Sequence, residues 1–181
     1  MNNSLFVVER ARAEEAATLL DYLKIIGGET DNLSFGAEGV PLSLEAEQDY
    51  LRSQYGSADN AQYFAKVGGE IIGTASLNRR SNRMSHRGVF GISLKKAWWG
   101  CGAAPALMDA ILAFARGNGF EQLNLEVRSS NARAIHLYEK YGFRKLCTFP
   151  HFFKINGEYI DFDLMNLELN TVDDYIGENT R

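Results

Sequence analysis

The spacing of apolar residues changes repeatedly along the chain, and each change predicts a switch between helix and strand. Apolar residues three and four positions apart are typical of a helix with one buried side, whereas β-rich runs and apolar–polar alternation are typical of strands. Helical spacing is found at residues 13–26, from residue 43 onwards, at 104–117 and at 131–141. Strands are predicted at residues 5–8, 62–67, 70–78, 87–94, 122–127, 143–153 and 158–169.

Glycine and serine residues set the predicted limits of the first two helices. Gly27-Gly28 follows the first helical run and is expected to end that helix. Ser43 is the expected N-cap of the second helix, because its hydroxyl can accept from a backbone N–H of the first turn. The predicted buried face of this second helix contains Ala46, Tyr50 and Leu51.

Two glycine-containing turns join neighbouring predicted strands. Gly68-Gly69 and Asn156-Gly157 each separate two β-rich runs, which is the pattern of a hairpin. Because helices alternate with strands and the chain ends in a hairpin, we expect a mixed α/β layer fold of the α+β type. A single domain is expected over residues 1–169, followed by a polar tail at 170–181.

Composition and charge narrow the classes of function. Hydrophobic residues make up 45% and charged residues 23% of the 181 residues, which is the balance of a globular domain with its own core. With 19 Lys and Arg against 23 Asp and Glu, the formal net charge is −4. This mild acidity argues against a nonspecific nucleic-acid or membrane binder, although it leaves room for a local site for an anion.

Neither cysteine has a partner at a spacing that would suggest a metal site or a disulfide framework. Cys101 and Cys147 lie 46 positions apart with no His or Cys at ligand spacing, and the three histidines are likewise isolated. We therefore expect no metal. The first residues lack the basic and apolar regions of a signal peptide, and no run of 18 apolar residues occurs, so a reducing cytoplasm is the expected setting.

A glycine-containing loop between a strand and a helix is the first candidate site. The strand ending at residues 91–94 leads into Trp98-Trp99-Gly100-Cys101-Gly102-Ala103-Ala104, and Pro105 then stands inside the start of a helix. Small residues before a helix N-terminus make an anion cradle, because backbone N–H groups are unpaired there. The third glycine of a dinucleotide fingerprint and the Gly-Lys-Ser/Thr of a P-loop are both absent. A tight turn without a ligand is the alternative interpretation.

The second candidate lies at residues 131–143. Asn131 stands where it can cap the helix that follows, and Ala134, Leu137, Tyr138 and Tyr141 share one helical face. From spacing alone, Tyr138 is equally consistent with a core aromatic, and Asn131 with a cap that has no further role.

Together these two motifs resemble the GNAT superfamily of acetyl-CoA-dependent N-acetyltransferases, over about residues 5–169. The segment 99–104 is similar to the pyrophosphate loop of that superfamily, Gln/Arg-x-x-Gly-x-Gly/Ala. Asn131-x-x-Ala134-x-x-Leu137-Tyr138-x-x-x-Gly142-Phe143 is similar to its second motif. The resemblance implies the GNAT fold: a mixed, mostly antiparallel, twisted sheet of six to seven strands with about four flanking helices, splayed at a cofactor cleft.

The resemblance also implies residue roles in a direct transfer of acetyl from acetyl-CoA to a primary amine within a ternary complex. Asn131 would bond the cofactor near the pantetheine, and Tyr138 would protonate the departing thiolate. No nucleophilic cysteine is required. The pantetheine arm would pair with the strand at Ile92, Ser93 and Leu94, and the pyrophosphate would lie at Gly100, Cys101, Gly102, Ala103, Ala104 and Pro105, of which Pro105 has no N–H to donate.

The sequence departs from the family pattern at Trp99, which replaces the usual Gln or Arg, and at Phe90, which replaces a Glu that often serves as general base. Glu126 is one candidate for the missing base, since the setting Leu125-Glu126-Val127-Arg128-Ser129-Ser130-Asn131 resembles that of the ribosomal-protein alanine acetyltransferases. Glu29, in the predicted loop after the first helix, is a candidate for binding the acceptor. For each, an ordinary surface carboxylate is the alternative.

Three functions remain open at this point. The first is an N-acetyltransferase for a small amine, the second is a protein N-terminal acetyltransferase of the ribosomal-protein type, and the third is a catalytically silent CoA-binding regulatory module. The absence of the family Glu at Phe90 favours the third. The resemblance also implies that the terminal hairpin can pair two copies into a homodimer.

Overall fold

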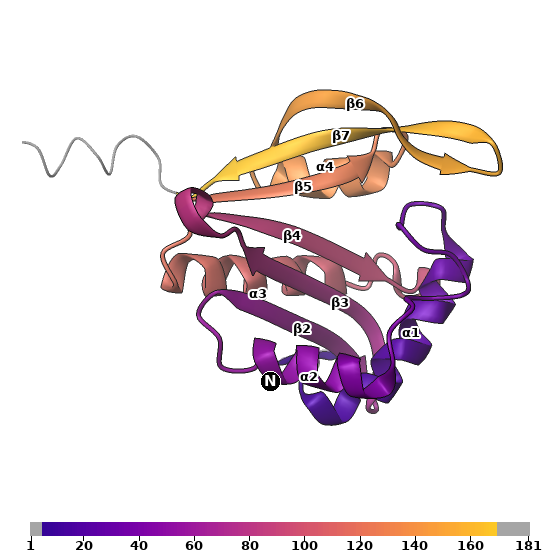
Figure 1. Cartoon of the computed structure of the whole chain (residues 1–181), viewed down its shortest axis with the longest axis vertical. Helices are drawn as coiled ribbons and strands as arrows, with labels where there is room; N and C mark the ends of the chain where they lie inside the picture. Colours follow the sequence, from indigo (N-terminus) through magenta and orange to yellow (C-terminus); the bar gives the residue numbers. More distant parts are fainter. Residues whose placement is uncertain (1–4, 170–181) are drawn as a thin grey trace, which may run out of the picture. The chain divides into compact units, whose positions relative to one another are not determined.

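The computed structural model describes residues 5–169, which contain seven strands and four α-helices (Figure 1). The strands are β1 (Val7–Arg10), β2 (Asn60–Val67), β3 (Glu70–Arg79), β4 (Arg87–Leu94), β5 (Gln122–Arg128), β6 (Arg144–Ile155) and β7 (Glu158–Glu168). The helices are α1 (Ala16–Glu29), α2 (Leu44–Gln54), α3 (Ala103–Gly117) and α4 (Ala132–Lys140), with short 3-10 helices η1 (Ala13–Glu15), η2 (Asn82–Met84) and η3 (Lys96–Trp98). The predicted polar tail at 170–181 lies outside the described residues.

The strands form one hydrogen-bonded sheet in the order β1-β2-β3-β4-β5-β7-β6. The pairs β1–β2, β2–β3, β5–β7 and β6–β7 are antiparallel. β4 and β5 are parallel, and their paired residues run from Arg87 with Gln122 to Val89 with Asn124. The predicted mixed, mostly antiparallel sheet of six to seven strands with about four helices is therefore confirmed.

The chain divides into two compact units. The first unit comprises the residues up to Asn78 together with Gly91–Phe114, and the second comprises Arg79–Phe90 together with the residues from Ala115 onwards. β4 and α3 each contribute residues to both units. The expectation of a single domain over residues 1–169 stays a prediction.

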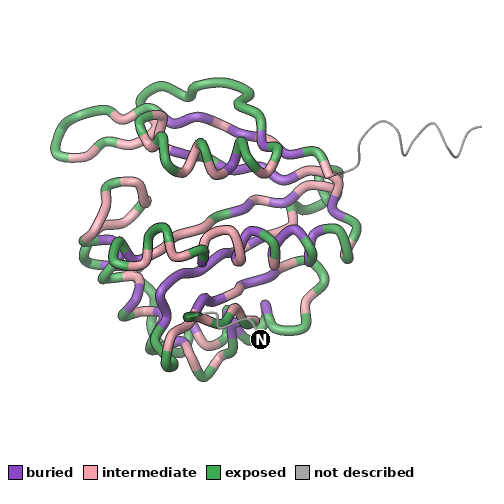
Figure 2. Tube along the Cα trace, turned by 180° about the vertical axis from the view of Figure 1, so that it is seen from behind, coloured by how far each residue is buried: buried purple, intermediate pink, exposed green. Residues whose placement is uncertain are grey.

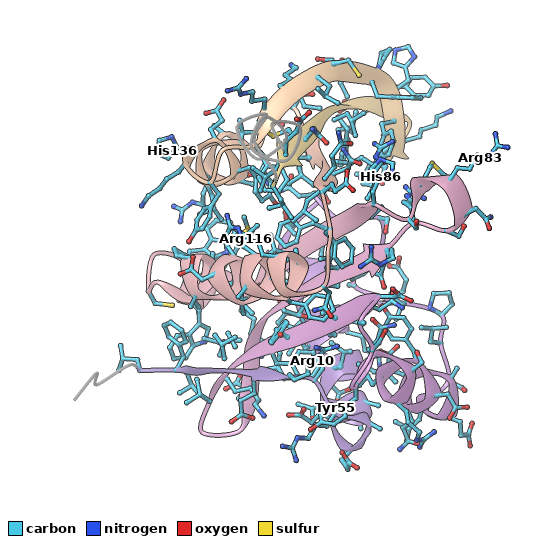
Figure 3. All side chains as sticks on the ribbon, turned by 90° about the vertical axis from the view of Figure 1, so that its left-hand side faces the viewer. Arg10, Tyr55, Arg83, His86, Arg116 and His136 are labelled. Carbon is cyan, nitrogen blue, oxygen red and sulfur yellow. The ribbon has the colours of Figure 1, made fainter. Side chains whose placement is uncertain are left out.

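In the first unit, α1 and α2 lie on one face of β2 and β3, and α3 lies on the other (Figures 1 and 3). The buried residues of α1 recur at helical spacing and point into one apolar cluster. This cluster consists of Ala11, Ala16, Leu19, Tyr22, Ile26, Leu51, Phe64 and Ile71. Burial of these apolar side chains is what fixes α1 against the sheet.

The predicted buried face of α2 is partly wrong. Ser43 does cap the helix, with its Oγ accepting from the backbone N–H of Ala46 at 3.2 Å. However, Ala46 and Tyr50 are exposed, whereas Glu47 is buried beside Leu51. Because the polar Glu47 occupies a core-facing position, the spacing of apolar residues predicted the wrong buried face for this helix.

The prediction that Gly27-Gly28 ends the first helix is also wrong, because α1 continues to Glu29. A Cβ on Gly27 would overlap the carbonyl oxygen of Gly36, so the missing side chain lets the segment after the helix approach it closely. Gly28 has ordinary space around it, since a Cβ added there would lie 3.5 Å from the Cβ of Ala37. Gly27 therefore serves close packing rather than helix termination, and the packing does not require a glycine at position 28.

The first strand is displaced from its predicted position by two residues, from 5–8 to Val7–Arg10. Leu5 is exposed, and pairing with β2 continues as far as Arg10 with Tyr63. The Arg10 guanidinium donates to the carbonyl oxygens of Gln54 and Asn60 at 2.6 and 2.7 Å. Main-chain pairing and these contacts keep a polar residue in the strand, which hydropathy does not predict.

In the second unit, β7 lies between β5 and β6, and α4 lies against one face of these strands (Figure 1). The outer strand β6 is exposed along most of its length (Figure 2). Asn156 and Gly157 have φ of 51° and 87° at the turn between β6 and β7, so the predicted Asn-Gly hairpin is confirmed.

The two helical glycines give a matched test of this packing. We expect Gly27→Ala to lower the free energy of unfolding by about 2 kcal/mol, because the methyl group displaces the Gly36 carbonyl. Gly28→Ala should instead raise that free energy by up to ~1 kcal/mol, since alanine favours a helix interior over glycine. Urea unfolding of both variants measures the difference, and equal shifts in the two would contradict this account of Gly27.

Candidate active site

The loop between β4 and α3 carries two glycines in the left-handed region. Gly100 and Gly102 have φ of 81° and 92°, and no atom lies within 4 Å of a Cβ built on either. Among residues 5–169, none of the N–H groups of Gly100–Ala104 donates to a backbone carbonyl. The first helical bond runs from the Ala106 N–H to the Gly102 carbonyl at 3.2 Å. These N–H groups at the helix start are free for an anion.

The remaining residues of this loop are small or lack a donor. Cys101 is half-buried and Ala103 is buried, and both side chains are small. Ala104 and Pro105 are half-buried in the first turn of α3, where proline has no intrahelical bond to lose. The predicted helix start is thus confirmed to within one residue.

Three hydrogen bonds fix the start of the loop. The Lys95 N–H donates to the Ile72 carbonyl at 3.0 Å, which ends β4 against β3. The Trp99 indole Nε1 donates to the Leu94 carbonyl at 3.1 Å, folding the loop back on the strand. The Lys96 N–H donates to Oε2 of Glu29 at 2.7 Å. Trp99 thus stabilises the loop at the position where the family usually has Gln or Arg.

Glu29 lies on the last turn of α1, and its prediction as a residue of the following loop is wrong because the helix runs through Gly27-Gly28. Among residues 5–169, its carboxylate has no other hydrogen bond or ion pair than the bond to the Lys96 N–H. Oε1 is therefore available to a ligand.

Ser93 on β4 is joined to α1 through Tyr22, a residue that the sequence pattern did not single out. The Tyr22 hydroxyl lies 3.0 Å from Ser93 Oγ, and burial raises the pKa of Tyr22 well above its ordinary value. Ile92 and Leu94, the neighbours of Ser93, are half-buried. The signal for Tyr22 was its place in the helical stripe with Leu19 and Ile26. The first unit thus brings together Glu29, residues 92–94 and the loop at 100–105.

In the second unit, Asn131 caps α4 as predicted. Its Oδ1 accepts from the backbone N–H of Ala134 at 3.3 Å. The side-chain amide of Asn131 has no acceptor among residues 5–169, so its two donors are available.

Tyr138 on α4 has a buried ring and a hydroxyl without a protein partner. Its ring packs edge-on against Phe90, with 6.1 Å between the ring centroids, and in a tilted arrangement against Phe143 at 5.8 Å. Within the described residues the hydroxyl makes no hydrogen bond, and burial raises the pKa of Tyr138 well above its ordinary value. The core-aromatic interpretation is therefore correct for the ring. The hydroxyl stays protonated at neutral pH and is free to donate.

Glu126 is exposed on β5, while Leu125 and Val127 on either side are buried. The alternation of a strand places the carboxylate on the opposite face from these two core residues, as predicted. Phe90 is 4% exposed and contacts both Tyr138 and Phe143, so the residue replacing the family Glu belongs to an aromatic cluster.

A buried aspartate, also not singled out by the sequence pattern, holds the segment that precedes Asn131. Asp163 Oδ1 on β7 accepts from Ser129 Oγ at 2.7 Å and from Thr148 Oγ1 at 2.9 Å, and pairs with Lys145 at 2.9 Å. Burial alone would raise the pKa of Asp163, but hydrogen bonds from Lys145, Ser129 and Thr148 outweigh it and hold this pKa below its usual value. The sequence signal that could have identified Asp163 is a carboxylate inside an alternating strand.

Two of the three histidines, His136 and His151, are exposed. His136 points away from α4 and Arg83 away from the η2 turn (Figure 3). His151 is exposed, and its ring stacks on Tyr159 at 4.5 Å. No group of three His, Cys, Asp or Glu side chains within residues 5–169 is arranged to hold a metal ion. In the same part of the chain, no helix is long and apolar enough to cross a membrane.

Two curated relatives resemble part of the chain. It is 32% identical over 102 residues to the L-amino acid N-acetyltransferase AaaT of Escherichia coli, covering 55% of this chain and 63% of that protein. It is 30% identical over 103 residues to the N-alpha-acetyltransferase RimI of Mycobacterium tuberculosis, covering 56% of this chain and 63% of that protein. The chain thus spans less than two thirds of the length of either relative.

The fold extends the similarity over most of the chain. The crystal structure of an acetyltransferase of the GNAT family from Streptococcus pneumoniae matches with a TM-score of 0.87 and 27% identity, covering 90% of this chain and 99% of that one. The family model described as the acetyltransferase (GNAT) family matches residues 31–143, which is more than half of the chain. The match confirms the resemblance of the two motifs, and the chain belongs to the acetyltransferase (GNAT) family.

Proposed function

We propose that this protein transfers the acetyl group of acetyl-CoA directly to a primary amine. The observation that carries the proposal is the set of free N–H groups at Gly100–Ala104, behind two glycines with positive φ and in front of a helix N-terminus. In a member of the GNAT family, such a loop fits the pyrophosphate of the acyl donor. Small residues let the phosphate oxygens approach the backbone.

The fit does not depend on basic side chains. The chain has a formal net charge of −4, and its anion donors at this loop are backbone N–H groups at the positive end of the α3 dipole. We assign the pantetheine arm to Ile92, Ser93 and Leu94 and to the free amide of Asn131. The N–H of Ile92 is assigned to the thioester oxygen, where negative charge develops.

The chemistry of transfer needs three events. A neutral amine forms the new C–N bond at the thioester carbon, the C–S bond breaks, and the amine loses a proton. Tyr138 is assigned to donate its hydroxyl proton to the departing CoA thiolate. Its hydroxyl supports this role, because it is protonated at neutral pH and no hydrogen bond within the described residues competes with the sulfur for it. Glu126 is assigned to accept the amine proton.

An L-amino acid or another small amine is the first candidate for the acceptor. The similarity to the amino-acid acetyltransferase of E. coli supports this class. The free Oε1 of Glu29 supports it as well, since a carboxylate oxygen binds an ammonium by a charge-assisted hydrogen bond.

A protein N-terminus is the second candidate acceptor. It is favoured by the setting of Glu126 and by the comparable similarity to the N-alpha-acetyltransferase of M. tuberculosis. A catalytically silent CoA-binding module is the alternative outside the enzymes. It is favoured by the buried Phe90 at the position where the family usually has its base.

A thiol-release assay separates these functions. We expect CoA release with free L-amino acids or small amines, and little release with peptides that carry the same residue at their N-terminus. Preferential release with peptides would favour the N-terminal acetyltransferase. If no amine or peptide releases CoA while calorimetry detects acetyl-CoA binding, the transferase proposal fails and the silent module is favoured.

Gly102→Ala tests the anion cradle, and Gly56→Ala is its matched control. Both glycines have positive φ, 92° and 79°, with nothing within 4 Å of the added methyl, so both variants carry similar backbone strain. We expect Gly102→Ala to weaken acetyl-CoA binding at least about tenfold in calorimetry, because the methyl occupies the space of the phosphate oxygens. Equal acetyl-CoA affinity in the two variants would remove the loop from the donor site.

Tyr138→Phe tests the proton donor. The change keeps the ring contacts with Phe90 and Phe143 but removes the hydroxyl. We expect kcat to fall about 10- to 100-fold with little change in the dissociation constant of acetyl-CoA. Steady-state kinetics and calorimetry measure the two quantities. A large loss of affinity with intact turnover would contradict the acid role.

A further inference from the structure

We infer that Glu29 is a positioning residue for the donor loop: its carboxylate fixes the conformation in which Gly100–Ala104 present their N–H groups. This inference rests on the proposed function, because it concerns the loop assigned to the pyrophosphate. It goes beyond the assignment of Glu29 to the acceptor, since it uses the other carboxylate oxygen and a different ligand. The contact that carries it joins Glu29 Oε2 to the Lys96 N–H at 2.7 Å, across 67 positions of sequence.

The position of Glu29 is unfavourable for its own helix. It is the last residue of α1, and the last turn of α1 contains no basic residue. Helix dipoles place partial negative charge at this end, so a carboxylate here is repelled. Among residues 5–169, the hydrogen bond that this carboxylate does accept comes from outside α1, from the Lys96 N–H.

The hydrogen bond from the Lys96 N–H to Glu29 also gives η3 the side-chain cap that its own N-cap residue does not provide. Lys96 is the first residue of η3, and its N-cap Lys95 makes no side-chain capping bond. A helical first turn leaves N–H groups without intrahelical partners, and an acidic oxygen is a favourable acceptor for them. Glu29 thus caps η3 from a distant helix. The side chain of Lys95 does not replace it, because that ammonium is paired with Glu70 at 2.6 Å.

The capped turn leads directly into the free N–H groups. η3 ends at Trp98, the Trp99 N–H donates to the Lys96 carbonyl at 3.1 Å, and the Trp99 indole donates to the Leu94 carbonyl at the same distance. Gly100 follows at once. Since Gly100 and Gly102 are conformationally permissive, the loop needs anchors at its start to keep its donors ordered. An ordered loop loses less conformational entropy on binding, so the anchor raises affinity for the acyl donor.

A backbone substitution isolates this hydrogen bond. Lys96→Pro removes the N–H, and the site accepts proline: it is a first helical position, and Lys95 before it has φ −56° and ψ 138°. Glu29→Ala removes the acceptor, and Glu29→Gln retains an oxygen that can accept the same bond. Asp31→Ala is the control, because Asp31 is an exposed carboxylate two residues further on.

The acetyl-CoA affinities of the double-mutant cycle are measured by calorimetry. We expect Glu29→Ala and Lys96→Pro each to weaken binding about five- to tenfold, and the double variant to bind no more weakly than either single variant. Glu29→Gln should recover affinity to within about twofold of the wild type, and Asp31→Ala should match the wild type. Independent, multiplicative losses in the double variant, or no loss in Glu29→Ala, would overturn the inference.

Hydrogen exchange of the unliganded protein gives a readout that does not need donor binding. We expect faster exchange of the Trp98 and Trp99 amides, which donate to the Lys95 and Lys96 carbonyls, in Glu29→Ala and Lys96→Pro, and wild-type exchange of both in Asp31→Ala. Unchanged exchange in both anchor variants overturns the inference. If the wild-type protein does not bind acetyl-CoA, the proposed function fails, and the exchange result alone decides whether Glu29 orders the loop.

Discussion

The backbone at the junction of β4 and α3 has to leave consecutive N–H groups without protein partners and still hold one conformation. Unpaired donors are tolerated where water can reach them, and a Cβ built on Gly100 or Gly102 meets no atom within 4 Å. Gly100 and Gly102 both have positive φ, and the hydrogen bonds at Lys95, Lys96 and Trp99 limit the conformational freedom that glycine brings. A binding site made of backbone dipoles is preorganised only when its anchors lie outside the loop.

The same constraint accounts for the contacts of α1. Tyr22 and Glu29 lie two turns apart on this helix, and they bond Ser93 on β4 and the N–H of Lys96. The helix is in turn held by its apolar stripe and by the close approach of Gly36 to Gly27. The hydrogen bonds of Tyr22 and Glu29 thereby link the packing of α1 against the sheet to the end of β4 and the start of the loop.

Local signals were sufficient for the elements, and long-range contacts account for the errors. The strand limits Arg87 and Leu94 and the cap at Asn131 follow from residues close in sequence, so spacing and capping rules found them. Gly27 looks like a helix terminator unless the carbonyl of Gly36 is known to lie against it. Once the helix is predicted to end at Gly27, Glu29 is wrongly placed in the following loop. Tyr22 and Ser93 are 71 positions apart, and no pattern along the chain relates them.

The two units solve different physical problems. In the first, polar backbone stays unpaired, and the start of the loop is held by the Glu29 carboxylate and the carbonyls of Ile72 and Leu94. In the second, Tyr138 keeps its hydroxyl unpaired while Phe90 and Phe143 exclude water from its ring. Replacement of a carboxylate by Phe90 strengthens that exclusion, since a charge beside the ring would bring water with it. Because Phe90 places no carboxylate beside Tyr138, we propose that the exposed Glu126 is the base.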